Sequence, residues 1–490
     1  MTMTEDTQDF VKDITKMSED FDRWYTDVVR KAELADHANL PGLGGMMVIR
    51  PYGYAIWETI QRAFDDLIKE SGHENAYFPL LIPRELFMKE HEHVEGFAPE
   101  VAWVTKAGSG MKDLEEPLVI RPTSETIIGP IMKRYIQSHR DLPQKVNQWC
   151  NVMRWELRTR LFLRTAEFLW QEGHTFHASY REAAEEVLLI LDYYRQVAED
   201  WLAVPVLTGR KSETEKFAGA DYTLSIEGMM RDGLALQMGT SHHLGQNFSR
   251  AYDIAFTNAD NERELCYTTS WGISTRLIGG LIMAHGDDSG LILPPRIAQV
   301  QAVVVPIFRD GEERAAIEEF LAPITAELKA ARVRHRVDWR DERPGPKFSY
   351  WELKGVPLRL EVGPREVGAG QLRLADRLSR AKRPLPAQGV GQAVQEELEG
   401  FQRRLYERAL EFREQNTFEV STLSELVAHF KERNGFVWAP WCGSTECEAR
   451  VKEETGGVST RNFPPDDKPA GECLVCGRKA EHRVVFARAY

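Results

Sequence analysis

Charged side chains that interrupt two apolar runs are the first sign of chemistry in this sequence. Both runs lie within residues 147–176, whose ionisable side chains include Arg154, Glu156, Arg164, Glu167, Glu172 and His174. Burying a charge is costly unless the charge is paired or used. These residues therefore predict a site for a charged ligand. The alternative is a set of structural ion pairs on a solvated sheet face.

Two antiparallel strands are expected to position these charges. The runs are rich in aromatic, branched and leucine side chains, and a short polar loop at residues 157–160 separates them. This pattern favours a hairpin over one continuous helix. We expect Arg154 and Glu156 on the first strand and Arg164 and Glu167 on the second.

A second polar group follows the apolar segment at residues 117–120. This segment predicts a strand that leads into a turn with Arg121, Thr123, Ser124 and Glu125. Ser or Thr with Glu just before an apolar helix is also typical of a helix N-cap, and the two interpretations are compatible. A carboxylate at a helix start is also well placed to receive a small cation.

A third group lies in the segments at residues 235–256 and 271–288. The first segment places five polar side chains between apolar strands, a density that packing alone explains poorly: Gln237, Thr240, Ser241, His242 and His243. The second predicts a strand, a turn with Arg276, and a small apolar helix. A cation at a helix start opposes the helix dipole, so we favour a phosphate-facing role for Arg276.

Length and charge limit the classes of protein to consider. A chain of 490 residues predicts two to four domains. The net charge of -13 argues against broad nucleic-acid affinity, yet residues 327–383 hold 15 Lys and Arg against 8 Asp and Glu. This basic module could bind RNA locally, or it could be a solvated face. The acidic N-terminus and the lack of an apolar run of 18 residues predict a cytoplasmic protein with no membrane partner.

The C-terminal half predicts two further units. Strands and helices alternate from residue 300, which is typical of a compact α/β domain, and a helix rich in Glu and Arg follows at residues 392–415. Four cysteines then occur in two close pairs, a spacing that suits an all-thiolate zinc site: Cys442, Cys447, Cys473 and Cys476. Cys150 and Cys266 lack this spacing and are expected in the core.

Taken together, these motifs resemble a known family. A long helix before Pro83, the hairpin with RWE and RTAEF, and the late strand with Arg276 resemble the three motifs of class II aminoacyl-tRNA synthetases. The strings RPTSE, FLRTAEFLWQEGHTF, EKFAGADYTLSIE, QMGTSHHLGQNFS, SWGISTR and HGDDSGLILPPR, with the four-cysteine tail, look like prolyl-tRNA synthetases of the archaeal and eukaryote-like type.

The resemblance implies an α+β protein with a defined domain order. Residues 1–290 would form a class II catalytic domain around an antiparallel sheet, and residues 291–298 a linker. Residues 299–400 would form an α/β anticodon-binding domain, and residues 401–490 a small zinc-binding α/β domain. The implied reaction is activation of L-proline with ATP and Mg²⁺, then transfer to the 3'-terminal adenosine of tRNA(Pro). A homodimer is implied, with no DNA partner.

The resemblance also implies roles for single residues. Arg154 and Arg276 would be catalytic. The ATP site would comprise Arg154, Glu156, Arg164, Thr165, Phe168, Gln237, Thr240 and Arg276. The proline site would comprise Thr123, Glu125, Arg154, Trp170, Glu172, His174, Phe217, His242 and Ser274. Ser274 stands where related sequences commonly have Thr, which keeps the hydroxyl and removes a methyl.

Further implications concern RNA, the chain end and editing. Lys347, Phe348, Glu352, Lys354 and Arg365 would contact the anticodon, with core packing of the aromatic residue and solvation of the charges as the alternative. The carboxylate of Tyr490 would lie near the catalytic domain. The roughly 95 residues between the second and third motifs leave no room for an editing insertion. Alternatives are a non-catalytic paralogue, which tends to lose the ATP arginines, and a synthetase for threonine, glycine or histidine.

Overall fold

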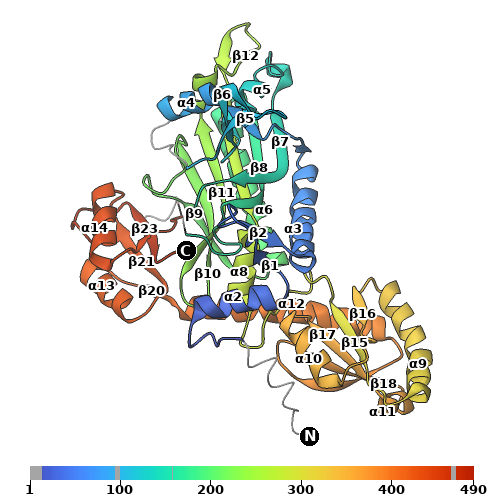
Figure 1. The fold of residues 1–490 in the computed structure, drawn as a ribbon. Helices are drawn as coiled ribbons and strands as arrows, with labels where there is room; N and C mark the ends of the chain where they lie inside the picture. Colours follow the sequence, from blue (N-terminus) through green and yellow to red (C-terminus); the bar gives the residue numbers. More distant parts are fainter. Residues whose placement is uncertain (1–13, 94–99, 157, 465–470) are drawn as a thin grey trace.

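A seven-stranded sheet forms the centre of the largest unit of this computed structural model, which describes residues 14–93, 100–156, 158–464 and 471–490 (Figure 1). Its neighbouring strands are antiparallel except for the first pair, which is parallel. In spatial order the strands are β3 (Glu74–Asn75), β7 (Gln144–Met153), β8 (Glu167–His177), β14 (Tyr267–Ser274), β11 (Ala235–Gly245), β10 (Tyr222–Met229) and β9 (Val206–Arg210).

The expected hairpin is present as β7 and β8, but its strands end earlier than predicted. Met153 pairs with Glu167, so β7 stops before Arg154 and β8 starts after Arg164. The prediction that Arg154, Glu156 and Arg164 lie on the strands is therefore wrong. They lie in a longer connection, residues 154–166, in which Leu157 is outside the described residues. These charges are therefore carried by the connection and not by the strands.

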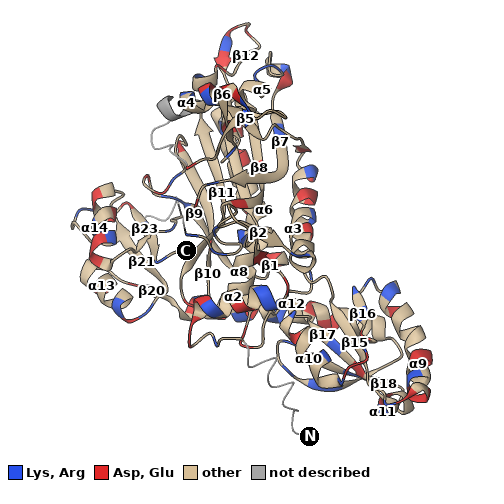
Figure 2. Ribbon diagram, in the orientation of Figure 1, with Lys and Arg blue, Asp and Glu red and all other residues tan. Residues whose placement is uncertain are grey.

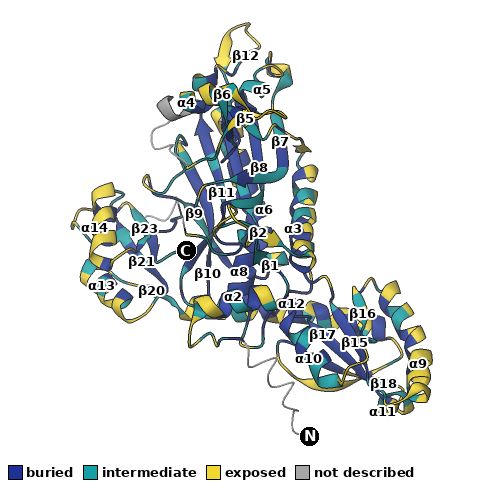
Figure 3. Cartoon of the chain, in the orientation of Figure 1, coloured by how far each residue is buried: buried dark blue, intermediate teal, exposed yellow. Residues whose placement is uncertain are grey.

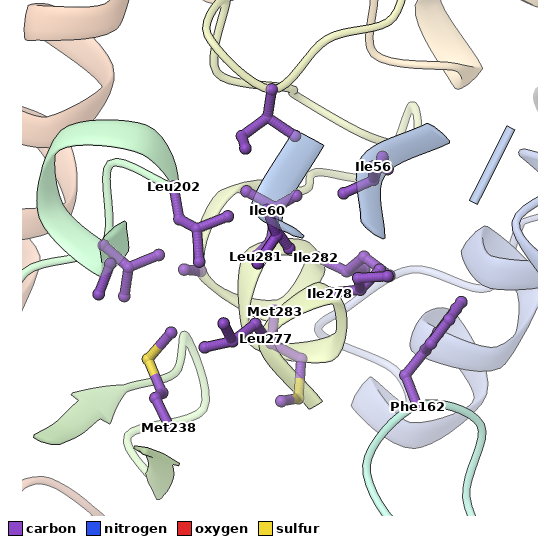
Figure 4. Close-up of a cluster of buried hydrophobic side chains, with 14 of the residues drawn as sticks. Ile56, Ile60, Phe162, Leu202, Met238, Leu277, Ile278, Leu281, Ile282 and Met283 are labelled. Atoms are coloured by element: carbon purple, nitrogen blue, oxygen red, sulfur yellow. The ribbon is translucent and has the colours of Figure 1, made fainter. Parts of the chain in front are cut away.

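Helices cover the sheet on the side away from the site described below. They are α3 (Pro51–Glu70), α6 (Tyr180–Gln196) and α8 (Arg276–His285), and a π turn, η2 (Val197–Trp201), extends α6. A further helix, α2 (Phe21–Lys31), packs against α8. Ser179 and Glu182 form a capping box that starts α6. Figure 4 shows the apolar side chains of α8 beside Ile56 and Ile60 of α3, together with Leu202 and Met238. This packing fixes the helix that begins with Arg276.

Smaller elements cover one end of the large sheet. A three-stranded sheet has the order β4 (Leu81–Pro83), β6 (Lys112–Ile120) and β5 (Trp103–Ala107), and β6 leads through residues 121–124 into α5 (Glu125–Met132). The predicted strand before the polar turn is therefore confirmed. The remaining elements of this unit are β1 (Ala35–His37), β2 (Met47–Ile49), α4 (Arg84–His93), η1 (His139–Asp141), α7 (Asn247–Tyr252), β12 (Ala255–Thr257) and β13 (Arg263–Leu265).

A second unit is built on a five-stranded mixed sheet, drawn at the lower right of Figure 1. Its strands are β16 (His335–Val337), β15 (Ala302–Pro306), β17 (Leu358–Val362), β18 (Gln371–Asp376) and β19 (Lys382–Pro386). The first three are parallel and β18 and β19 are antiparallel. Its helices are α9 (Gly311–Ala330), α10 (Pro344–Leu353) and α11 (Pro364–Gly368).

A third unit, at the left of Figure 1, contains the cysteine-rich tail. Its four-stranded sheet has the order β20 (Thr417–Glu419), β21 (Phe436–Trp441), β23 (His482–Ala487) and β22 (Ser459–Thr460), with α13 (Leu423–Glu432) and α14 (Thr445–Thr455). The single helix α12 (Val390–Gln415) leads from the second unit to the third. The boundary expected at residue 400 falls inside this helix.

Burial and charge separate the sheets from their surroundings. The strands of the large sheet are mostly buried, whereas α9, α13 and α14 expose much of their surface (Figure 3). Charged residues gather on helices and loops at the periphery in Figure 2. In the described part of the chain, no helix is long and apolar enough to cross a membrane.

Candidate active site

A cavity of about 300 Å³ opens on one face of the large sheet. Alternation along each strand places every second side chain on this face. The register sets His174 beside Ser270 and Ser270 beside His242, and it sets Trp170 beside Ser274. The predicted site residues that line the cavity are Thr123, Glu125, Arg154, Phe168, Trp170, Glu172, His174, Phe217, Gln237, Thr240, His242, Ser274 and Arg276.

Two arginines give the cavity a cationic end. The guanidinium of Arg154 donates to the Pro122 carbonyl at 3.1 Å and lies 5.5 Å from the Phe168 ring. Arg276, the first residue of α8, donates through Nε to the Leu163 carbonyl at 3.2 Å. Burial, reinforced by the positive charges of Arg154 and Arg164, lowers the pKa of Arg276 to about 10. Mutual repulsion of this kind is relieved when an anion binds.

Three predicted nucleotide residues lie outside the cavity lining. Arg164 is half exposed, and its guanidinium is 3.9 Å from the Glu156 carboxylate. Thr165 is buried, and its hydroxyl donates to the Glu167 carbonyl at 2.8 Å. All three belong to the connection between β7 and β8, so the structure places them beside Arg154 but does not bring them into the pocket.

The opposite end contains a buried acid and histidine pair. Glu172 and His174 are separated by 3.0 Å, and Gln148 donates to the other oxygen of Glu172 at 2.7 Å. Burial would raise the pKa of Glu172, but the hydrogen bond and charge of His174 hold it below its ordinary value. Burial would lower the pKa of His174, but Glu172 holds it above its ordinary value. Both shifts favour the charged forms of the pair.

Ser124 and Thr123 complete this end from the turn before α5. Ser124 occupies the N-cap position but its side chain makes no capping bond; its hydroxyl donates to Glu172 instead. Thr123 donates to Glu125, and both side chains are buried. Ser124 thus precedes the helix, as the N-cap interpretation expects, while its side chain faces Glu172 of the pocket. The carboxylates of Glu125 and Glu172 provide acceptors for an ammonium group.

The neighbouring histidines of β11 have different roles. His242 lines the cavity, where its Nδ1 lies 2.9 Å from the Thr223 hydroxyl and its ring lies 4.7 Å from Phe217. Burial, with the positive charge of His174 as a smaller cause, lowers the pKa of His242 to about 3, so this ring is neutral. His243 lies on the opposite face against Tyr180. The expectation that all five polar residues lie between strands is wrong, because β11 carries them on its two faces.

Several residues that line the cavity were not predicted. They are Glu215, Lys216, Thr223, Met238, Gly239, Ser270, Trp271, Gly272 and Ile273. Ser270 is the most informative, because its buried hydroxyl has no hydrogen-bond partner among the residues that the structure describes. In the sequence, Ser270 could have been noticed because it directly precedes Trp271 in the SWGISTR motif. A Cβ on Gly173 would lie 2.1 Å from the Trp271 ring, so this glycine admits the tryptophan.

The structure divides the predicted anticodon residues. Glu352 lies with Arg359, which donates to it at 2.9 Å and lies 4.1 Å from the Phe348 ring. Lys347 is buried and donates to the Asp338 carbonyl at 3.1 Å. Lys354 is also buried, and it pairs with Glu33 of the first unit.

Arg365 does not join this group either. It lies on α11, which follows the far end of β17. Glu352 instead shares a small cavity with charged side chains from β17, from β18, from the turn after β18 and from β19, namely Arg359, Asp376, Arg377, Arg380 and Lys382.

The four tail cysteines converge as predicted. Their sulfurs all lie within 4.8 Å of one another, and Cys442 is 3.7 Å from both Cys447 and Cys476. Tetrahedral zinc with bonds of about 2.3 Å would place its sulfurs about 3.8 Å apart. The described cysteines form no disulfide. The cluster therefore fits a metal ion with four thiolate ligands.

The last residue packs on the catalytic unit. The amide of Tyr490 donates to the Ala235 carbonyl at 3.1 Å, and its hydroxyl donates to Asp232. The guanidinium of Arg160, in the connection after β7, lies 5.0 Å from the Tyr490 ring and 4.7 Å from the Tyr25 ring.

Comparisons with known proteins agree with this geometry. A family model described as "tRNA synthetase class II core domain (G, H, P, S and T)" matches residues 104–285, "Anticodon binding domain" matches residues 301–397, and "Prolyl-tRNA synthetase, C-terminal" matches residues 423–490. A proline–tRNA ligase from Symbiobacterium thermophilum is 52% identical over 98% of this chain and 99% of its own length. The chain belongs to the prolyl-tRNA synthetase family.

Other members of the family support the same assignment. A proline–tRNA ligase from Roseiflexus sp. is 52% identical over 97% of this chain and 99% of its own length. The crystal structure of the Cryptosporidium parvum prolyl-tRNA synthetase with halofuginone and AMPPNP has a TM-score of 0.92 and 40% identity, covering 97% of this chain and 99% of that one. A second structure of that enzyme, with L-proline and AMP, has a TM-score of 0.90 and 39% identity, with the same coverage.

This chain has the domain architecture of the prolyl-tRNA synthetase family. A class II core with an antiparallel sheet precedes an anticodon domain and a C-terminal domain with a cysteine cluster that could bind metal. The segment between β8 and β14, residues 178–266, is described throughout and contains α6, η2, β9 to β11, α7, β12 and β13. These elements belong to the catalytic unit, which leaves no separate insertion domain within this described segment.

Proposed function

We propose that the cavity binds ATP and L-proline side by side and converts them to prolyl-adenylate with release of pyrophosphate, after which proline is transferred to the 3'-terminal adenosine of tRNA(Pro) with release of AMP. This is the reaction of a proline–tRNA ligase, the activity by which the homologues are named. The observation that carries the proposal is the pairing, in one cavity, of a cationic end at Arg154 and Arg276 with a carboxylate end at Glu125 and Glu172.

The two ends suit the two substrates. Attack of the proline carboxylate on the α-phosphate brings two anions together and builds further negative charge. Arg154, whose charge also interacts with Glu125 and Glu172, would contact the carboxylate and the α-phosphate, whereas Arg276 and Arg164 would bind the distal phosphates. Mg²⁺ would share that charge when it is bound. Because the protein supplies no nucleophile, orientation and electrostatics lower the barrier.

The remaining assignments concern single contacts. Phe168 would stack on adenine and Glu156 would accept from its amino group, with Thr165, Gln237 and Thr240 supporting the nucleotide. Thr123, Glu125 and His242 would bind the proline ammonium. Trp170, Glu172, His174, Phe217 and Ser274 would shape the ring pocket, and Ser270 joins them because its hydroxyl is buried and unpartnered among the described residues.

The second and third units would serve tRNA and metal binding. Specific RNA recognition relies on aromatic rings that stack on unpaired bases and on hydrogen bonds to base edges. Phe348 would supply the stacking ring, and Glu352 would accept the hydrogen bonds. A role in tRNA binding for Lys347, Lys354 and Arg365 stays a prediction. Cys442, Cys447, Cys473 and Cys476 would hold structural Zn²⁺. This tail and the domain order favour the archaeal and eukaryote-like type. We also propose that the protein acts in the cytoplasm as a homodimer.

ATP–pyrophosphate exchange with each amino acid, in the absence of tRNA, tests the proposal. We expect exchange with proline far above that with alanine or cysteine. No exchange with any amino acid, from folded protein that contains metal, would favour the non-catalytic paralogue. Exchange with threonine, glycine or histidine instead would show that the pocket assignment is wrong. Sedimentation of the same sample tests the dimer.

A further inference from the structure

One wall of the cavity is a loop with no regular structure of its own. Residues 211–221 connect β9 to β10, and Glu215, Lys216 and Phe217 of this loop line the cavity. The Phe217 amide donates to the Thr223 hydroxyl at 3.0 Å, and the Phe217 ring lies against His242. Backbone hydrogen bonds to the neighbouring strands occur at the two ends of the loop, at Lys211 and Asp221. Between these ends, the position of the loop also depends on side-chain contacts.

The start of this loop is held by a carboxylate from the third unit. Glu448 of α14 accepts from the Ser212 hydroxyl at 2.9 Å and from the Thr214 hydroxyl at 2.6 Å. The hydroxyl of Thr460 donates to the same carboxylate. Glu448 is only 5% exposed and Ser212 only 2% exposed. The buried side chain of Glu448 thus connects helix α14 to the loop after β9, and Glu448 and Ser212 are 236 positions apart in the sequence.

The chemistry of these contacts makes them restrictive. All three partners described for Glu448 are neutral hydroxyl groups, so its charge is stabilised by hydrogen bonds whose geometry must be kept. Hydrogen bonds to a charged acceptor are about twice as strong as those between neutral groups. Movement of Ser212 or Thr214 away from the carboxylate would leave a buried charge poorly solvated. The carboxylate therefore favours a single arrangement of the loop.

We infer that Glu448 is a positioning residue for amino acid binding, because it holds residues 212–217 in the arrangement that places Phe217 over the amino acid end of the cavity. The inference rests on the proposed function of that cavity. Two backbone turns carry the effect: the amides of Glu215 and Lys216 donate to the Ser212 carbonyl at 3.2 and 2.9 Å. Fixing Ser212 thus fixes the residues directly before Phe217.

Other contacts dock the third unit independently of Glu448. The backbones of Arg210 and Phe463 exchange two hydrogen bonds of 2.8 and 2.9 Å at the edge of the large sheet. Arg461 pairs with the buried Glu227 at 3.0 Å. Substitution of Glu448 should therefore leave the units docked and release only the loop. Cys447 precedes Glu448, so the cysteine cluster holds the same turn of α14.

The test uses Glu448→Gln, which keeps the size of the side chain and removes its charge. Glu453→Gln is the matched control, because Glu453 is exposed on the same helix and carries the same charge. In pyrophosphate exchange we expect KM for proline to rise about tenfold in Glu448→Gln, with KM for ATP and kcat within about twofold of the parent values. Glu453→Gln should match the parent protein. Hydrogen exchange at residues 211–219 should be faster only in Glu448→Gln.

A loop variant keeps the inference testable if Glu448→Gln fails to fold. Ser212→Ala with Thr214→Val removes the same hydrogen bonds from the other side and should raise KM for proline similarly. A protein with both the loop substitutions and Glu448→Gln should have a KM for proline close to that of either variant alone. An unchanged KM for proline with unchanged hydrogen exchange overturns the inference, and so do equal changes in both KM values and kcat. A parent protein with no proline-dependent exchange would overturn the proposed function instead.

Discussion

One carboxylate, Asp287, contributes to the junction between the first two units, and its removal should weaken the protein measurably. Asp287 follows α8 and accepts from both terminal nitrogens of Arg377, at 2.9 and 2.6 Å, and from Arg380 at 3.1 Å. Burial would raise the pKa of Asp287, but the hydrogen bonds and charge of Arg377 lower it to about 2. The shift from 3.8 corresponds to about 2 kcal/mol in favour of the folded state.

The prediction is that Asp287→Asn loses about 2 kcal/mol of unfolding free energy at pH 7. Asp288→Asn is the control, because Asp288 is exposed and accepts from the Met17 amide. Because the folded pKa of Asp287 is depressed, its contribution is present above pH 4, roughly the unfolded pKa, and is lost as pH falls towards 2. Urea unfolding, followed by tryptophan fluorescence, should thus show the same deficit from pH 5 to pH 8.

A functional measurement separates docking from folding. Arg377 and Arg380 also line the small cavity beside Glu352. Loss of the Asp287 contacts should therefore lower tRNA charging more than proline-dependent pyrophosphate exchange. Equal stability of Asp287→Asn and Asp288→Asn would refute the reasoning, because it would mean that the cost of desolvating these charges cancels their attraction.

Four further predictions concern the cavity and the tail. Arg276→Ala should reduce pyrophosphate exchange by at least about 100-fold while urea unfolding shows no loss of stability, because repulsion from Arg154 and Arg164 is relieved. His174→Asn should remove stability that is fully present below about pH 6.5 and lost as pH rises through the raised pKa of His174, which unfolding at pH 6 and pH 9 measures. Cys473→Ser should release the metal and make the third unit sensitive to protease, whereas Cys266→Ala should retain the metal. The enzyme should form alanyl-adenylate but leave alanyl-tRNA intact, since pocket discrimination against smaller side chains is limited; thin-layer assays of both products would detect rapid clearance if this is wrong.

Local pattern predicted much of the catalytic sheet but not the exact ends of its strands. Aromatic and branched residues marked β7 and β8, yet the pattern could not show that pairing stops at Met153. Strand ends depend on partners across the sheet, and those partners are distant in sequence. The same limit applies to β11, where register decides that His242 faces the cavity and His243 faces α6.

The contacts between units could not be predicted from sequence patterns. Asp287 and Arg377 are 90 positions apart, and nothing in either segment marks the other. The sequence around Lys354 suggests a cation that faces solvent. In the structure this side chain is buried between the first two units, where it pairs with Glu33. The cysteine cluster was predictable because four thiolates at close spacing have few other uses. Single Asp, Glu, Lys and Arg side chains have many possible roles, so their partners can be identified only from the structure.

The buried carboxylate of Glu227 connects the docking of the third unit with the charge of the active site. Burial would raise the pKa of Glu227, but the charges of Lys211 and Arg461 hold it below its ordinary value. Glu227 in turn supports the charged form of Arg276, which Arg154 and Arg461 oppose. Glu227 offsets only part of the positive charge of Lys211, Arg461 and Arg276, and the remaining positive charge suits a triphosphate. Arg461 belongs to the third unit, so its docking sets part of the electrostatics of the nucleotide end and does more than cover a sheet edge.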